Sequence, residues 1–108
     1  MNTAISKFTV SKSGVYAFLP QFRTKFLDEG VLCIGMSATA NPQYPICAHA
    51  GSSFLYAPKN TTLCINGINF HELTAGVTYY IVAYQTSSST ITIEDVNWYR
   101  VMLMREIK

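Results

Sequence analysis

The chain has 108 residues and a mass of 12.0 kDa, which suits one small domain. Hydrophobic residues make up 49% and charged residues 13%, with a formal net charge of +2. An average protein carries about 25% charged residues, so this composition excludes a disordered chain and predicts apolar surface covered by a partner. The small charge excludes nucleic acid as a partner, and the short apolar runs exclude membrane insertion by a helix.

The three cysteines are Cys33, Cys47 and Cys64. An odd number leaves at least one thiol unpaired, whereas small secreted domains usually have an even disulfide framework. Residues 1–7 also lack the features of a signal peptide, which favours synthesis in a reducing cytoplasm. Because Cys33 and Cys64 lie within apolar runs, we expect both thiols to be reduced, buried and slow to react.

The first third of the chain is typical of short strands separated by turns. Residues 8–10 alternate in polarity, residues 11–14 are turn residues, and strand character resumes until Pro20 stops it. Gln21–Glu29 is ambiguous, because its phenylalanines have the spacing of a helix face. We interpret this segment as a strand or an irregular connection, with a short helix as the alternative.

The middle of the chain contains the strongest turn signal. Residues 31–36 are apolar on both strand faces, and the two prolines of residues 41–45 indicate a loop. Asn66-Gly67 separates two apolar runs, and both of these residue types accept a positive φ. The sequence therefore predicts a hairpin at this point, with Ile68–Phe70 as its return strand.

Val77–Tyr84 has the highest β propensity in the chain and is apolar on both faces. The polar segment Gln85–Ser89 predicts a hairpin loop, and Thr90–Glu94 and Trp98–Ile107 predict the last strands. Eight or so short strands favour an antiparallel sandwich or barrel. An antiparallel strand normally shows one polar face to water, so the two-faced strands predict a second covering, most simply another subunit.

Two segments resemble the tumour-necrosis-factor and complement-globular-head superfamily. Phe8–Phe18 is similar to its early strand pair, and Leu73–Gly76 followed by Val77–Tyr84 is similar to its Leu-x-Ala-Gly-Asp strand entry. Val77 replaces the usual acidic residue, and Trp98–Arg100 replaces the usual Phe-x-Gly. Similar jelly rolls occur on bacteriophage virions as knobs and decorations.

The resemblance implies a jelly-roll β-sandwich at residues 8–108 behind a short arm at residues 1–7, assembled as an obligate homotrimer. The two-faced strands and the closing strand then supply the expected subunit interface: Tyr80, Val82, Tyr84, Tyr99, Val101 and Leu103. Tyr and Trp are common at interfaces, because they combine apolar area with a polar group.

Residues for catalysis or for a cofactor are sparse. Cys47 and His49 share a strand face, but zinc needs two more ligands, and no CxxC or HxxxH spacing occurs. The adjacent carboxylates of residues 28–29 and 94–95 would point to opposite faces of a strand. We therefore expect no enzyme activity, no metal and no cofactor. The aromatic and histidine side chains nearest to loops are the candidates for ligand or receptor contact: Tyr44, His49 and Tyr56.

Three functions remain open at this stage. The first is a virion structural protein, a trimeric jelly roll that decorates a bacteriophage capsid or caps an appendage and contacts other virion proteins. The second is the tip of a tail fibre that binds a host receptor or surface carbohydrate. The third is a small intracellular binding or metal protein. The early start of the fold, about seven residues from Met1, favours the first, and fold analogy alone cannot fix function.

Overall fold

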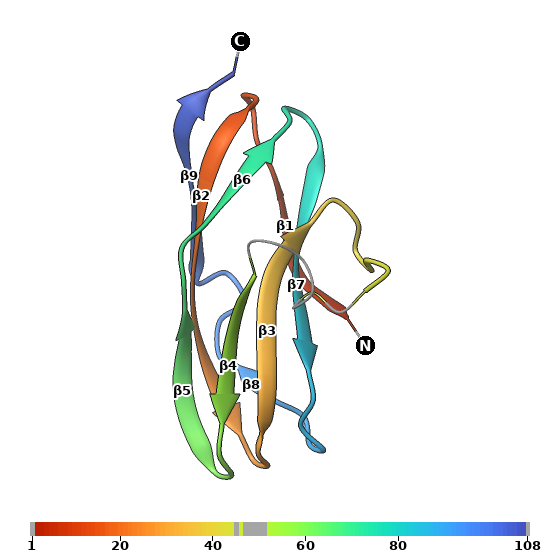
Figure 1. Cartoon of the computed structure of the whole chain (residues 1–108), viewed down its shortest axis with the longest axis vertical. Coiled ribbons are helices and arrows are strands. Elements are labelled where there is room, and N and C mark those ends of the chain that lie inside the picture. Colours follow the sequence, from red (N-terminus) through yellow and green to blue (C-terminus); the bar gives the residue numbers. More distant parts are fainter. Residues whose placement is uncertain (1, 45, 47–51, 108) are drawn as a thin grey trace.

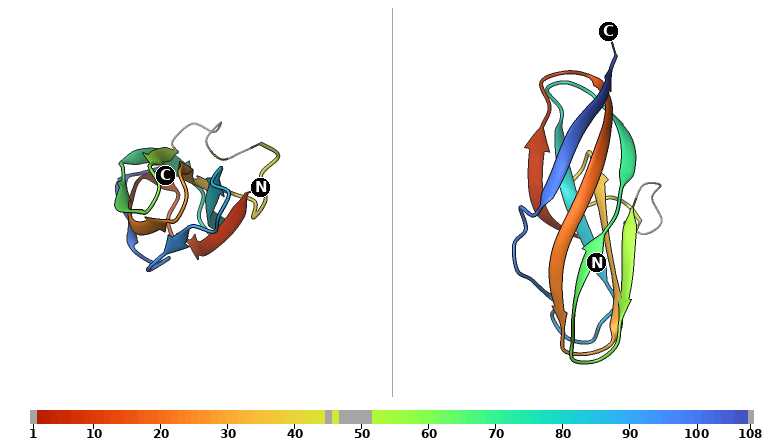
Figure 2. Two further views of the ribbon diagram at one scale, coloured as in Figure 1. Left: turned by 90° about the horizontal axis from the view of Figure 1, so that it is seen from below. Right: turned by 90° about the vertical axis from the view of Figure 1, so that its left-hand side faces the viewer.

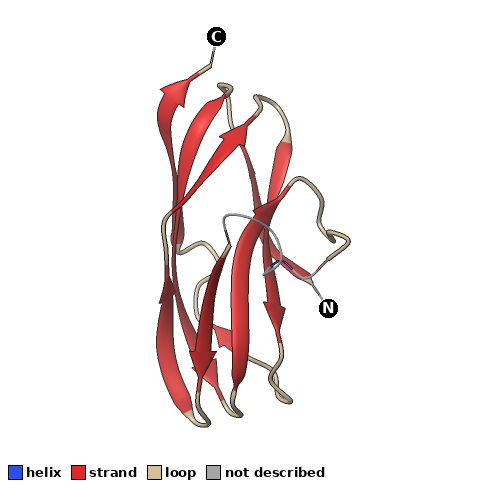
Figure 3. Ribbon diagram, in the orientation of Figure 1, coloured by secondary structure: helices blue, strands red, loops and turns tan. Residues whose placement is uncertain are grey.

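The structure, a computed structural model, describes residues 2–44, 46 and 52–107. Those residues form two antiparallel sheets that face one another, which confirms the expected all-β class (Figures 1 and 3). One sheet has the order β1-β7-β3-β4; in the other, β5, β6, β8 and β9 all pair with β2. The molecule is elongated, 48 × 24 × 19 Å. The strands are β1 (Thr3–Thr9), β2 (Gly14–Phe26), β3 (Gly30–Ser37), β4 (Ser53–Ala57), β5 (Thr61–Asn66), β6 (Asn69–Leu73), β7 (Thr78–Gln85), β8 (Thr92–Ile93) and β9 (Tyr99–Glu106).

The amino-terminal segment is part of the sheet. β1 begins at Thr3 and pairs with β7. Residues 3–7 of the expected arm, residues 1–7, are therefore part of a strand, and the expectation of an arm is wrong for them. The reason lies in its side chains, because Ile5 and Phe8 both pack against the core between the sheets. A register shift in β1 falls at Ile5, between Ala4 and Ser6.

β2 is the central strand of its sheet and continues through Pro20, where the sequence predicted a stop. The amide of Gln21 donates to the carbonyl oxygen of Trp98 on the β9 side. Amides alternate in direction along a strand, so the nitrogen of Pro20 points to the β5–β6 side. On that side the partner is interrupted between Asn66 and Asn69. The missing proline donor therefore costs no sheet hydrogen bond.

Asn66-Gly67 is an interruption in a strand, and the expected hairpin is wrong. β5 pairs with Gln21–Phe26 and β6 with Gly14–Phe18, both antiparallel to β2, so the chain keeps its direction (Figure 1). The only described residues with positive φ are Asn60 and Gly76, so the hairpin turn geometry does not form here. Glycine at position 67 instead gives room to the Ser53 hydroxyl, which would collide with a Cβ.

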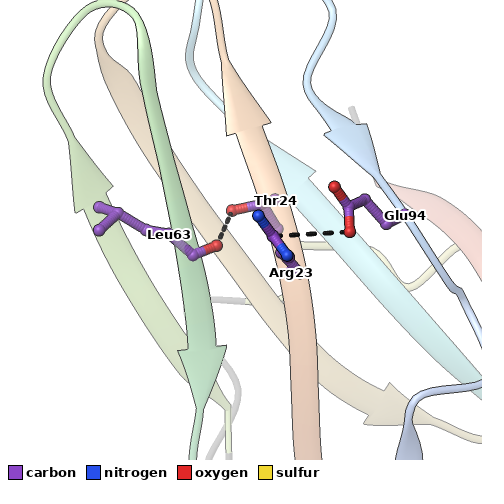
Figure 4. A network of polar contacts seen from close by, with 4 residues as sticks. All are labelled: Arg23, Thr24, Leu63 and Glu94. Atoms are coloured by element: carbon purple, nitrogen blue, oxygen red, sulfur yellow. Dashed lines mark hydrogen bonds and ion pairs between the residues drawn. The ribbon is translucent and has the colours of Figure 1, made fainter.

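The ambiguous segment Gln21–Glu29 contains the second half of β2, which settles it as a strand. Phe18, Phe22 and Phe26 are all fully buried between the sheets. Their four-residue spacing keeps one face in a strand as well as in a helix. Thr24 shares that buried face, and its hydroxyl donates to the carbonyl oxygen of Leu63 at 2.9 Å (Figure 4). The buried hydroxyl is thus satisfied.

The expected hairpin loop at Gln85–Ser89 is also wrong, because the chain crosses there from β7 in one sheet to β8 in the other (Figure 1). The serines of this connection bind the turn between β2 and β3. The Ser89 hydroxyl donates to the Asp28 carboxylate, and the Ser87 hydroxyl donates to the Asp28 carbonyl oxygen at 3.2 Å. The hydrogen bond from Ser89 lowers the pKa of Asp28 below its ordinary value.

The cysteines differ from the expectation of reduced, buried thiols. Cys33 is buried as expected, but it is disulfide-bonded. Cys64 is free and exposed, because it lies on the outer side of β5 opposite the exposed Arg23. Cys47 lies outside the described residues.

Candidate functional site

An exposed apolar surface lies on the outer side of the five-stranded sheet. Ala17 of β2 pairs with Phe70 of β6 on one side and with Met102 of β9 on the other. Side chains directly opposite one another on a sheet face are in contact range. Phe70 and Met102 therefore flank Ala17, which is only 2% exposed, while they themselves are 59% and 49% exposed. The right-hand view of Figure 2 looks onto β9, β2 and β6, which carry this row.

Alternation along β2 extends this row into a surface. Val15 and Leu19 lie two residues before and after Ala17, on the same face, and both are partly buried. Met104, beside the register shift of β9, is 57% exposed. We call this surface the outer apolar face: Val15, Ala17, Leu19, Phe70 and Met102.

Charged residues border the outer apolar face. Val15 pairs with Glu72 of β6 and with Arg105 of β9, so opposite charges lie on opposite sides of β2. Leu19 pairs with Arg100 of β9. An apolar centre with a charged rim is the composition of a protein interface. Farther along β2, the exposed side chains are charged: Arg23 Nε lies 3.6 Å from Glu94 Oε2 (Figure 4). The outer apolar face therefore does not extend to this end of β2.

The expected interface on β7 is largely covered by the chain itself. Val82 is fully buried, in a second cluster with Cys33 and Ile46 on the outer side of the four-stranded sheet. Ile46 comes from the connection between β3 and β4. It occupies the space above Gly35, where a Cβ would lie 2.6 Å from Ile46 Cγ1. Val82 is therefore not available to another subunit, and this residue of the expected interface is wrong.

The amino terminus holds this cap in place. Asn2 Oδ1 accepts a hydrogen bond from the amide of Ile46 at 2.9 Å. Asn2 Nδ2 donates to the carbonyl oxygens of Pro42 and Tyr44, at 3.2 and 2.8 Å. Tyr80 and Tyr84 pack against the same cluster and are partly buried. The second covering predicted for the two-faced strand is thus provided, at Val82, by the chain's own connection.

The other expected interface residues lie on β9. Tyr99 and Val101 point inward, pack against the core and are partly buried. The ring of Tyr99 lies 5.9 Å from that of Phe18, and its hydroxyl lies 3.2 Å from Ser6 Oγ. Leu103 pairs with Tyr16 and is 42% exposed. It is the one expected β9 residue with a large exposed fraction.

The expected ligand contacts are placed on separate segments. Tyr44 is exposed in the connection after β3, and Tyr56 is exposed on the outer side of the edge strand β4. The Tyr56 hydroxyl donates to Glu29 Oε2 at 2.9 Å, and this carboxylate raises the pKa of Tyr56. His49 lies outside the described residues. In the described part of the chain, no group of three or more His, Cys, Asp or Glu could hold a metal.

Sequence reasoning missed Phe70, Ala17 and Met102 as one surface. The available signal was that residues 15–18 and 101–104 are apolar on both strand faces. The hairpin expected at Asn66-Gly67 hid the contribution of β6, because it paired Phe70 with β5 instead of β2.

Comparisons with known proteins return no match to a family model, a curated protein or a solved structure. Among the described residues, no helix is long and apolar enough to span a membrane. The interpretation of function therefore depends on the surfaces themselves.

Proposed function

We propose that the chain is a non-enzymatic assembly module that binds further copies of itself through the outer apolar face. The observation that carries this proposal is the exposed pair Phe70 and Met102 on either side of Ala17. Soluble monomers rarely leave more than a few hundred Å² of contiguous apolar surface in water. Covering such a surface stabilises an assembly by roughly 25 cal/mol per Å².

Charge complementarity supports a second copy as the occupant. Glu72 and Arg105 lie on opposite sides of Val15. A twofold axis along β2 would place Glu72 of each copy opposite Arg105 of the other, and Phe70 opposite Met102. Both contacts are favourable, since a twofold interface must be complementary to itself and sulfur packs well on aromatic rings.

An alternative form of the assembly is a homotrimer about a threefold axis that serves as a virion structural protein, a jelly roll that decorates a capsid or caps an appendage. Its support is the sequence resemblance. The disulfide at Cys33 adds to that support, because disulfides persist on virion and cell surfaces and are rare in the cytosol. The mass of the assembly distinguishes the trimer from the twofold pair.

Light scattering coupled to size exclusion tests the assembly. We expect the wild-type protein at micromolar concentration to have a multiple of its 12.0 kDa mass. The variant Phe70→Asp should be monomeric, because a buried unpaired charge costs about 3–5 kcal/mol. Phe54→Asp is the matched control: Phe54 is 74% exposed, but it lies on the outer side of β4 in the other sheet. A wild-type monomer, or equal effects of the two variants, would contradict the proposal.

A second candidate function is carbohydrate or receptor binding, as expected of a fibre tip. The observation that favours it is the pair of exposed aromatic side chains Phe54 and Tyr56 on β4, with Glu29 beside the Tyr56 hydroxyl. Exposed aromatic rings bind sugar faces, and a carboxylate accepts hydrogen bonds from sugar hydroxyls. A glycan array probed with wild-type protein and with Tyr56→Ala tests it, and binding that is lost in the variant would support it.

A further inference from the structure

A cavity of about 370 Å³ lies between the two sheets, beside β8. Its size falls in the range of small-molecule sites. Residues of β1, β3 and β7 in the four-stranded sheet form one side, and residues of β8 and of the crossing that leads to it form the other. The complete lining is Thr3, Ile5, Leu32, Ala83, Gln85, Thr90, Ile91 and Ile93.

Two features of the strands create this cavity. The register shift in β1 inserts Ile5 as an additional residue between Ala4, the partner of Val82, and Ser6, the partner of Ile81. β8 has two residues and pairs with β2 alone, so it does not close onto β1. The edge between the sheets therefore stays open at this point, with isoleucine side chains on both sides.

Gln85 lines this cavity, and its side-chain oxygen is an unsatisfied acceptor. Its Oε1 atom is buried, and in the described part of the chain it has no hydrogen-bond donor. Gln85 pairs with the inward-facing Leu32, so its side chain points between the sheets. Buried polar atoms are nearly always hydrogen-bonded, and an exception needs an explanation. A ligand that carries a donor would supply the missing hydrogen bond.

We propose that this cavity binds a small apolar molecule with one hydroxyl group. The isoleucine side chains would contact its hydrocarbon part, and its hydroxyl would donate to Gln85 Oε1. No charged residue lines the cavity, which argues against an ionic ligand. This site is separate from the outer apolar face, so either proposal can fail while the other holds.

A matched pair of probes, 1-naphthol and naphthalene, tests the proposal on the whole chain. Isoleucine methyl NMR reports the site, with Ile68 and Ile107 as internal controls because both are exposed and neither lines the cavity. We expect both probes to shift the methyl signals of Ile5, Ile91 and Ile93. One added hydrogen bond should make 1-naphthol bind about threefold to tenfold more tightly than naphthalene.

Variants separate the cavity from its acceptor. Gln85→Met keeps the side-chain length but removes the acceptor, so it should bind both probes equally. Thr3→Phe should block the cavity, whereas Thr9→Phe, on the same strand outside the lining, should not. No methyl shifts in the wild-type protein at about 1 mM probe would overturn the site. Equal wild-type affinities for the two probes would overturn the role of Gln85.

Discussion

Small residues at three positions show where another group must fit. Gly35 lies beneath Ile46, and Gly67 makes room for the Ser53 hydroxyl. Ala17 is covered by Phe70 and Met102 from the two neighbouring strands. In each case the group that needs the space comes from another strand or connection. The tertiary structure therefore explains why a small residue stands at each position.

The disulfide at Cys33 predicts a specific labelling pattern. Cys64 is exposed and free, so a thiol reagent should modify it within the folded protein. Cys33 should stay unmodified in denaturant until a reductant is added. Mass spectrometry of peptides after stepwise alkylation measures this. Modification of Cys33 in denaturant without reductant would show that the thiol is free.

Asp28 predicts a measurable carboxyl titration. The hydrogen bond from Ser89 favours the charged carboxylate and lowers its pKa. Ser89→Ala should raise the pKa of Asp28 toward its ordinary value of 3.8, as followed by carboxyl NMR. Because the folded pKa is lowered, this contact stabilises the fold above the unfolded pKa and is lost as the pH falls through the folded pKa. Ser11→Ala, at an exposed residue in the other turn, should leave the titration unchanged.

At the scale of elements, β2 is the one strand that pairs with all four others of its sheet, because two short strands lie in line on each side of it. β5 and β6 follow it on one side, and β8 and β9 follow it on the other. Within each pair, the two short strands run in the same direction, and both are antiparallel to β2. Turn residues at these interruptions therefore mark a gap between two strands that run in the same direction. Local sequence propensity alone predicts a hairpin there.

The cap formed by Ile46 over β3 and β7 predicts a stability difference between two isoleucines. Ile46 is fully buried, and Ile68, in the interruption between β5 and β6, is 57% exposed. Ile46→Ala should lower the free energy of unfolding by about 2–5 kcal/mol, and Ile68→Ala by at most about 0.5 kcal/mol. Urea unfolding followed by circular dichroism measures both. Equal losses would show that the cap contributes no packing.

At the scale of the whole molecule, the two sheets have different outer surfaces. The four-stranded sheet is covered at Val82 by a connection of the same chain. The five-stranded sheet leaves Phe70 and Met102 exposed around β2. The partner surface that we propose therefore lies on the five-stranded sheet and not on β7.

The sequence by itself determined the all-β class and most strand positions, because alternation, β propensity and turn residues are local properties of the chain. It also showed that Val77–Tyr84 is apolar on both faces, and Val82 on the outer face is covered. Only the tertiary structure decided which group provides that covering, which strands pair across Asn66-Gly67, and that Cys33 is bonded while Cys64 is exposed. Each of these depends on contacts between residues far apart in the chain, and a local pattern carries no record of such contacts.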